Sequence, residues 1–129
     1  MKFHHVGIAT KNIEETKNKI SKMMNIIEES EIIFDELQDA RLCMLSLDNN
    51  FKIELIEGNV VSNFVKKRNY LYHTCYSVSD INKTIEKLVL DGALLISAEK
   101  PAILFDGKKV AFLMTDIGIV ELLEESDSL

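Results

Sequence analysis

The chain lacks the features that would place it with nucleic acids, in a membrane or among exported proteins. Its 15 lysines and arginines are outnumbered by 21 aspartates and glutamates, which gives a net charge of −6, whereas nucleic-acid binding usually needs a basic face. No apolar run is long enough to span a bilayer, and the N-terminal segment has no signal-peptide stretch. We therefore expect a soluble cytoplasmic protein that binds neither nucleic acid nor membranes.

Cysteine is also scarce, with two in 129 residues. Cys43 and Cys75 each lie in an apolar run that resembles a strand. Without an export signal, we expect both to be reduced core residues and not to form a disulfide. The whole sequence is 47% hydrophobic and 28% charged, which is typical of a globular protein with a real core. The length suits one compact domain, or two half-domains too small to be stable alone.

An internal repeat organises the sequence. Three blocks in the first half match three blocks in the second half at a shift of 67 or 68 residues. The matching blocks are 3–24 with 71–92, 40–47 with 108–115, and 53–57 with 120–124. Their order is the same in both halves, which indicates two copies of one ancestral module.

Each copy is predicted to contain a strand, a helix and then three strands. The first helix is expected at about 12–25, where Asn12 and Glu15 resemble a capping pair and apolar residues recur at helical spacing. In the second copy, Asp91 and Gly92 are predicted to end the helix. The expected strands lie near 2–9, 31–35, 40–47 and 51–57 in the first copy, and around His73 and near 94–97, 109–114 and 117–123 in the second.

These elements predict one α+β domain spanning 1–129, with module one at 1–57, a linker at 58–69 and module two at 70–125. Segment 98–108 lacks periodicity and is a candidate loop for closing over a site. In each module the helix covers one face of the sheet, so the other face must meet a partner sheet. Two tandem βαβββ modules, packed within one chain or across a dimer, would form a curved, cup-like mixed sheet with a concave interior.

Four polar residues at equivalent places in the two copies are candidate metal ligands: His5, Glu54, His73 and Glu121. Because side chains alternate along a strand, each of them is predicted to point away from the helix and into the concavity. A carboxylate in the middle of an apolar strand is costly unless it is neutralised, so two such carboxylates beside two histidines indicate one shared divalent cation. This mixed nitrogen and oxygen set suits Zn, Ni, Co, Mn or Fe(II), and affinity order does not choose among them.

The sequence resembles the vicinal oxygen chelate superfamily, which includes glyoxalase I (lactoylglutathione lyase), methylmalonyl-CoA epimerase, extradiol dioxygenases and bleomycin-resistance proteins. The residues that carry the resemblance are HHVGIATKNIEE at 4–15, FKIELIEG at 51–58, YHTCYSVSDI at 72–81 and KKVAFLMTDIGIVELLEE at 108–125. The resemblance covers nearly the whole chain. It implies two βαβββ modules that enclose one metal ion held by the four residues named above, often in a homodimer.

The His, Glu, His, Glu set is similar to that of bacterial glyoxalase I. The resemblance therefore implies a metal-dependent lyase or isomerase of the lactoylglutathione lyase type, with a small-molecule thioester or hemithioacetal as substrate. Its reaction would be proton transfer through a metal-stabilised enediolate. In this scheme Glu121 is the implied base, and Glu36 is the candidate for the opposing acid that an epimerase needs.

Other functions remain open. The first helix lacks the Phe-Tyr pair common in glyoxalases, and the only arginines, Arg41 and Arg68, do not form a set for a glutathione carboxylate. A methylmalonyl-CoA epimerase-like racemase is therefore the alternative, with the basic cluster 66–68 as a candidate contact for CoA. An oxygen-using Fe(II) enzyme usually has two histidines and one carboxylate, so the fourth ligand counts against it. A non-catalytic, resistance-type binding protein would lack ligands, so the intact set counts against that function too.

Overall fold

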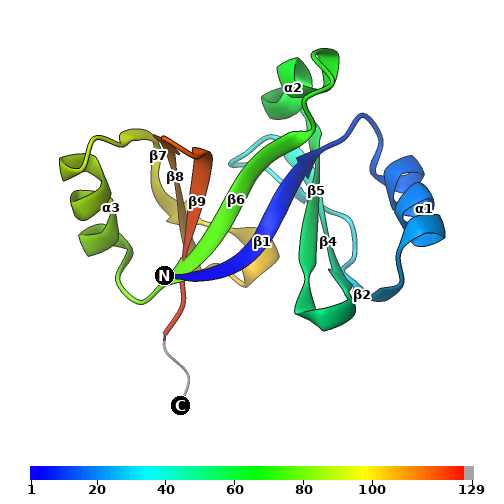
Figure 1. Ribbon diagram of the computed structural model, residues 1–129, viewed down its shortest axis with the longest axis horizontal. Helices are drawn as coiled ribbons and strands as arrows, with labels where there is room; N and C mark the ends of the chain where they lie inside the picture. Colours follow the sequence, from blue (N-terminus) through cyan, green and yellow to red (C-terminus); the bar gives the residue numbers. More distant parts are fainter. Residues whose placement is uncertain (127–129) are drawn as a thin grey trace. The chain divides into compact units, whose positions relative to one another are not determined.

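The structure is a computed structural model that describes residues 1–126. It divides into two units, one comprising His5–Tyr72 and the other comprising Met1–His4 together with the chain from His73 onward. Each unit contains one helix-and-sheet module (Figure 1). No helix within the described residues is long and apolar enough to cross a membrane.

Module one consists of β1 (Lys2–Ala9), α1 (Ile13–Met23), β2 (Ile26–Glu29), β3 (Ile33–Asp35), β4 (Ala40–Leu47) and β5 (Lys52–Gly58). Strand β1 pairs in parallel with β5, and β5 pairs antiparallel with β4. Strands β2 and β3 both pair antiparallel with β4. Figure 1 shows α1 on one side of this sheet.

Module two repeats this plan with β6 (Leu71–Val78), α3 (Ile81–Leu90), β7 (Leu94–Pro101), β8 (Lys109–Thr115) and β9 (Gly118–Glu124). Strand β6 pairs in parallel with β9, β9 pairs antiparallel with β8, and β8 pairs antiparallel with β7. One long strand, β7, takes the place of the two short strands β2 and β3. The predicted α+β class is confirmed. Module two has the predicted βαβββ order, and module one has one additional short strand, β2.

Three segments differ from the sequence prediction. Strand β2 was not predicted, because it is short and mostly exposed and so has no apolar alternation to mark it. The expected loop 98–108 is wrong at its start, since β7 runs on through Pro101. Proline is tolerated there because β7 ends the order of paired strands and needs no hydrogen bonds on its outer side. The expected linker 58–69 contains a short helix, α2 (Ser62–Lys66).

The repeat is preserved in the packing of the two helix-facing cores. In both modules the first residue of the helix is fully buried, Ile13 in one and Ile81 in the other. The buried residues at equivalent positions are Ile13, Cys43, Leu45, Ile53 and Leu55 in module one, and Ile81, Ala111, Leu113, Val120 and Leu122 in module two. Cys43 and Cys75 are buried thiols, as predicted, and burial raises the pKa of the Cys43 thiol.

Each helix is also held to its sheet by a carboxylate that the sequence prediction did not identify. The backbone N–H of Ile13 donates to Glu57 Oε1 at 2.9 Å, and that of Ile81 donates to Glu124 Oε2 at 3.0 Å. Helix N-termini carry unpaired N–H groups and partial positive charge, so a carboxylate is a favourable partner there. In both modules this bond therefore connects the helix to the strand that carries a candidate glutamate ligand, Glu54 or Glu121.

In module one, Arg41 on β4 extends this contact. Its guanidinium donates to Glu57 Oε1 at 3.0 Å and to Glu14 Oε2 on α1 at 2.8 Å. The hydrogen bond from Arg41 is the main cause that holds the pKa of Glu14 below its usual value. One of the two arginines in the chain is therefore engaged with the carboxylates beside α1.

We predict that Glu57→Ala and Glu124→Ala will each lower the free energy of unfolding by about 1–2 kcal/mol. Each substitution removes the carboxylate that accepts a hydrogen bond from the first N–H of a helix, and the residue that donates this bond is buried. Urea denaturation followed by circular dichroism will measure the change. Glu86→Ala, at an exposed position on α3, is the control and should stay within about 0.5 kcal/mol of the parent. An equal loss in all three variants would contradict the anchoring role.

We also predict that Glu14→Gln will be less stable than the parent at neutral pH and that this difference will shrink in acid. The folded-state pKa of Glu14 is lowered, so its stabilisation is present above the unfolded pKa and is lost as pH falls through the folded pKa. Thermal unfolding between pH 7 and about pH 3 spans this window. Glu15→Gln removes the neighbouring charge and is the control. A pH-independent difference would contradict the Arg41 interaction.

Candidate functional site

In module one, the structure brings His5 and Glu54 together. His5 lies on β1 and Glu54 on the adjacent parallel strand β5, where it is opposite Gly7. Since Gly7 is two residues after His5, all three side-chain positions lie on one face of the sheet. His5 Nε2 is 3.1 Å from Glu54 Oε1, and both side chains are buried.

Module two contains the same pair at the equivalent register. Glu121 on β9 lies opposite Cys75 on β6, two residues after His73. His73 Nε2 is 3.0 Å from Glu121 Oε1, again with both side chains buried. On the other side of Glu121, Phe112 of β8 is its neighbour in register and contacts the His73 ring edge-on, with the ring centroids 5.5 Å apart.

The flanking residues explain why each glutamate points away from its helix. Ile53 and Leu55, on either side of Glu54, are buried in the core beneath α1. Val120 and Leu122, on either side of the second glutamate, are buried in the equivalent core beneath α3. Because side chains alternate along a strand, the glutamate between two core residues must lie on the opposite face. This local part of the prediction is observed in both modules.

The donor chemistry of each pair fits a divalent ion. Two ligands that bind an ion at about 2.1 Å and at right angles lie about 3.0 Å apart, which matches the spacing in both pairs. A hydrogen bond from imidazole to carboxylate has the same length, so the distance alone does not identify a ligand pair. Imidazole nitrogen with carboxylate oxygen is the mixed set that first-row metals and zinc accept.

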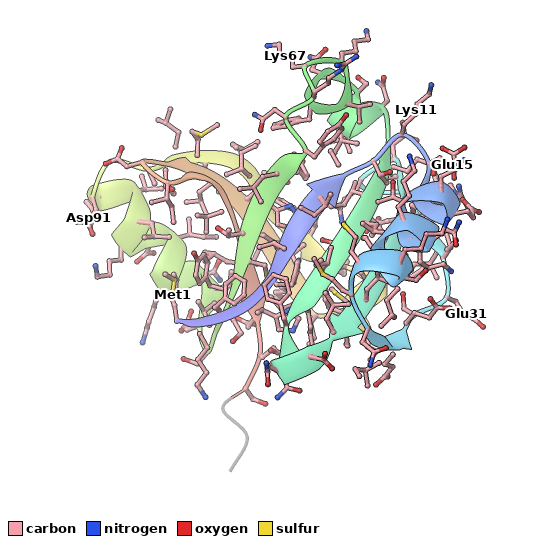
Figure 2. All side chains as sticks on the ribbon, turned by 45° about the vertical axis from the view of Figure 1, so that its right-hand side comes forward. Met1, Lys11, Glu15, Glu31, Lys67 and Asp91 are labelled. Carbon is pink, nitrogen blue, oxygen red and sulfur yellow. The ribbon has the colours of Figure 1, made fainter. Side chains whose placement is uncertain are left out.

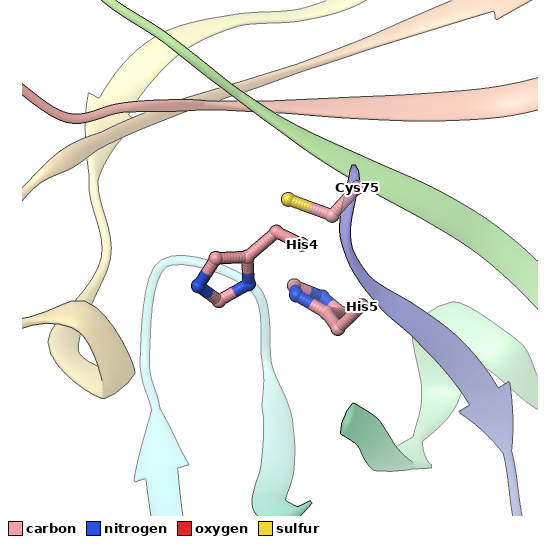
Figure 3. A group of neighbouring side chains, drawn as sticks. All are labelled: His4, His5 and Cys75. Atoms are coloured by element: carbon pink, nitrogen blue, oxygen red, sulfur yellow. The ribbon is translucent and has the colours of Figure 1, made fainter. Parts of the chain in front are cut away.

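His4 is a further polar side chain in this part of module two and is not among the predicted ligands. It is half-buried, its ring meets the edge of Phe105 with centroids 5.7 Å apart, and one of its ring nitrogens lies within 4.8 Å of Cys75 Sγ. Figure 3 shows the side chains of His4 and Cys75. Since Cys75 is opposite Glu121, this cluster lies on the face that carries Glu121.

The remaining predicted residues lie at the surface. Glu36 is exposed in the turn between β3 and β4, where the neighbouring Asp35 carboxylate accepts hydrogen bonds from the backbone N–H groups of Leu37 and Gln38. The basic cluster 66–68 is exposed at the end of α2, and Lys67 extends away from that helix (Figure 2). A catalytic role for Glu36 and a substrate contact for the basic cluster stay predictions.

Comparison with known proteins connects this arrangement to one family. The family model described as the Glyoxalase/Bleomycin resistance protein/Dioxygenase superfamily matches residues 4–112. The matched segment contains three of the four candidate ligands, all except Glu121. A comparison with curated proteins gives no match.

Several solved structures are similar over nearly the whole chain. A methylmalonyl-CoA epimerase from Mycobacterium tuberculosis is 19% identical with a TM-score of 0.77, covering 97% of this chain and 88% of that one. A hypothetical protein from Bacillus halodurans is 22% identical with a TM-score of 0.73, covering 99% and 96%. A selenomethionine form of methylmalonyl-CoA epimerase is 16% identical with a TM-score of 0.75, covering 98% and 97%. At these identities the likeness establishes the fold.

Proposed function

Because the chain belongs to the glyoxalase/bleomycin resistance protein/dioxygenase superfamily, we propose that His5, Glu54, His73 and Glu121 together hold one divalent metal ion. The observation that carries the proposal is the His–Glu pair, which recurs in both modules at the same strand register and with nearly the same separation. Neither pair is required by the helix-facing cores, which lie on the opposite side of each strand. The two pairs join around the ion either within one chain or across a homodimer.

The function that follows is metal-dependent proton transfer at a carbon next to a carbonyl or thioester group, as in a glyoxalase-type lyase or isomerase. A bound divalent ion would act as a Lewis acid toward a substrate oxygen and stabilise its negative charge. Glu121 is the proposed base: its carboxylate takes the proton from the reacting carbon and, in a lyase, returns it to the neighbouring carbon. An epimerase returns a proton to the other face of the same carbon and needs an opposing acid, for which Glu36 is the candidate. His73, 3.0 Å away, orients this carboxylate, and Phe112 limits the rotation of the His73 ring.

A lactoylglutathione lyase-like reaction and a methylmalonyl-CoA epimerase-like reaction both fit this chemistry. The arginines favour the epimerase-like reaction. Arg41 is bound by Glu14 and Glu57, so Arg68 alone is left to bind a glutathione carboxylate. The exposed cluster 66–68 offers three cations for the phosphates of CoA. A non-catalytic, resistance-type binding protein is the third candidate and requires no bound metal.

We predict that the purified protein binds Ni, Co, Mn or Zn with a stoichiometry of one ion per set of four ligands. His5→Ala should weaken binding by more than about a hundredfold, because even outer partners of metal ligands contribute about ten- to a hundredfold. Isothermal titration calorimetry after chelator treatment will measure this. Glu86→Ala, at an exposed position on α3, is the control. A parent without stoichiometric metal, or equal losses in the two variants, would count against the site.

We further predict that the metal-loaded protein exchanges substrate α-protons for solvent deuterium, measured by NMR. The two substrates are the hemithioacetal of methylglyoxal and methylmalonyl-CoA, so the result also chooses between lyase and epimerase. Glu121→Gln at saturating metal should slow exchange by about 10²–10⁴-fold, as expected for loss of a general base. Glu124→Gln, three residues along the same strand, should exchange normally. Binding of metal without exchange on either substrate would retain the metal centre and reject both reactions.

A further inference from the structure

A groove lies beside the helix and the outer strand of each module, but the two grooves differ in chemistry. In module one the groove beside α1 and β2 has a volume of about 480 Å³, and its charged lining consists of Glu14, Lys17, Glu28 and Glu29. In module two the groove beside α3 and β7 has a volume of about 610 Å³. Its lining is mostly apolar and includes Tyr76, Leu88, Ala93, Leu94, Met114 and Ile117. Because both modules share one plan, the apolar lining is not a requirement of the fold.

The groove in module two is separate from the proposed metal centre. Tyr76 and Val120 belong to its lining, and each is the sequence neighbour of a residue on the other face, Cys75 and Glu121. Alternation along β6 and β9 therefore places the groove on the helix side of this sheet. His73 and Glu121 lie on the opposite side.

The charged side chains that line this groove are both carboxylates, Asp91 and Asp116, and Met1 with its α-amino group also belongs to the lining. Asp91 follows the last turn of α3 (Figure 2), where Lys87 Nζ lies 3.1 Å from its Oδ2. Asp116 lies in the turn between β8 and β9 and makes no hydrogen bond or ion pair with any residue in the range 1–126. Both carboxylates are exposed, so each attracts a cation with the modest strength of a surface charge.

We propose that this groove binds a lipophilic organic cation, such as an aryl or alkyl ammonium compound. Its volume lies within the range of small-molecule sites, which are mainly apolar with a few polar groups that fix orientation. The apolar body would lie on Leu88, Leu94 and Ile117, where burial of its surface supplies most of the affinity. The cationic centre would lie near Asp116.

The test uses two ions of the same size and opposite charge, tetraphenylphosphonium and tetraphenylborate. In a ¹⁵N NMR titration of the full-length protein, the cation should give saturable shifts at the amides of residues 88–94 and 114–118, and the anion should not. Asp116→Asn should weaken cation binding by about two- to fivefold, the effect expected for an exposed charge. Asp48→Asn, at the equivalent turn of module one, is the matched control and should leave binding unchanged.

A second variant keeps the test independent of Asp116. Ile117 is 70% exposed, so Ile117→Lys should fold normally, abolish binding of the phosphonium ion and allow binding of the borate. Ile27→Lys, at a 63% exposed position in the groove of module one, should have no effect. Equal binding of the two ions, or no saturable binding, would overturn the proposal. A groove that is covered by a second copy of the chain would also overturn the proposal. In that case the parent would be a dimer that binds neither ion, and Ile117→Lys would dissociate it.

Discussion

Most of the structure depends on the burial of a carboxylate in the middle of an apolar strand. Glu54 is 3% exposed and Glu121 is 1% exposed, and an uncompensated charge at such a depth would be strongly destabilising. Each carboxylate therefore needs a polar partner on the same face, and a histidine on the adjacent parallel strand supplies it. The apolar residues on either side of the glutamate face the helix and form its core. One constraint thus determines both faces of each module.

The same two strands carry a second carboxylate three residues later, and its direction is opposite. An odd spacing along a strand reverses the face, so Glu57 and Glu124 point toward the helices and accept hydrogen bonds from their first N–H groups. The short motif Glu-x-x-Glu therefore does two things in each module. Its first glutamate joins a histidine, and its second glutamate sets the position of the helix relative to that strand.

The two modules share this plan, but the residues beside their His–Glu pairs and the residues that line their grooves differ. Glu54 has Gly7 and Met44 as its neighbours in register, whereas Glu121 has Cys75 and Phe112. Module two therefore places aromatic and thiol groups beside its His–Glu pair, and module one places a glycine and a methionine there. The helix-side grooves differ as well, with charged residues in module one and apolar residues in module two. Such differences mark positions that the fold leaves free to change, and they are where specificity can arise.

The sequence by itself determined the repeat, the strands with strong alternation and the identity of both His–Glu pairs. These features follow from local periodicity and residue type, which can be recognised in the sequence without knowing which distant residues are in contact. The short strand β2, the helix α2 and the extension of β7 through Pro101 were decided by tertiary pairing, because their own patterns are weak. The same is true of Arg41, whose two carboxylate partners are 16 and 27 residues away along the chain. Contacts of that kind depend on which strands become neighbours, and only the folded chain establishes this.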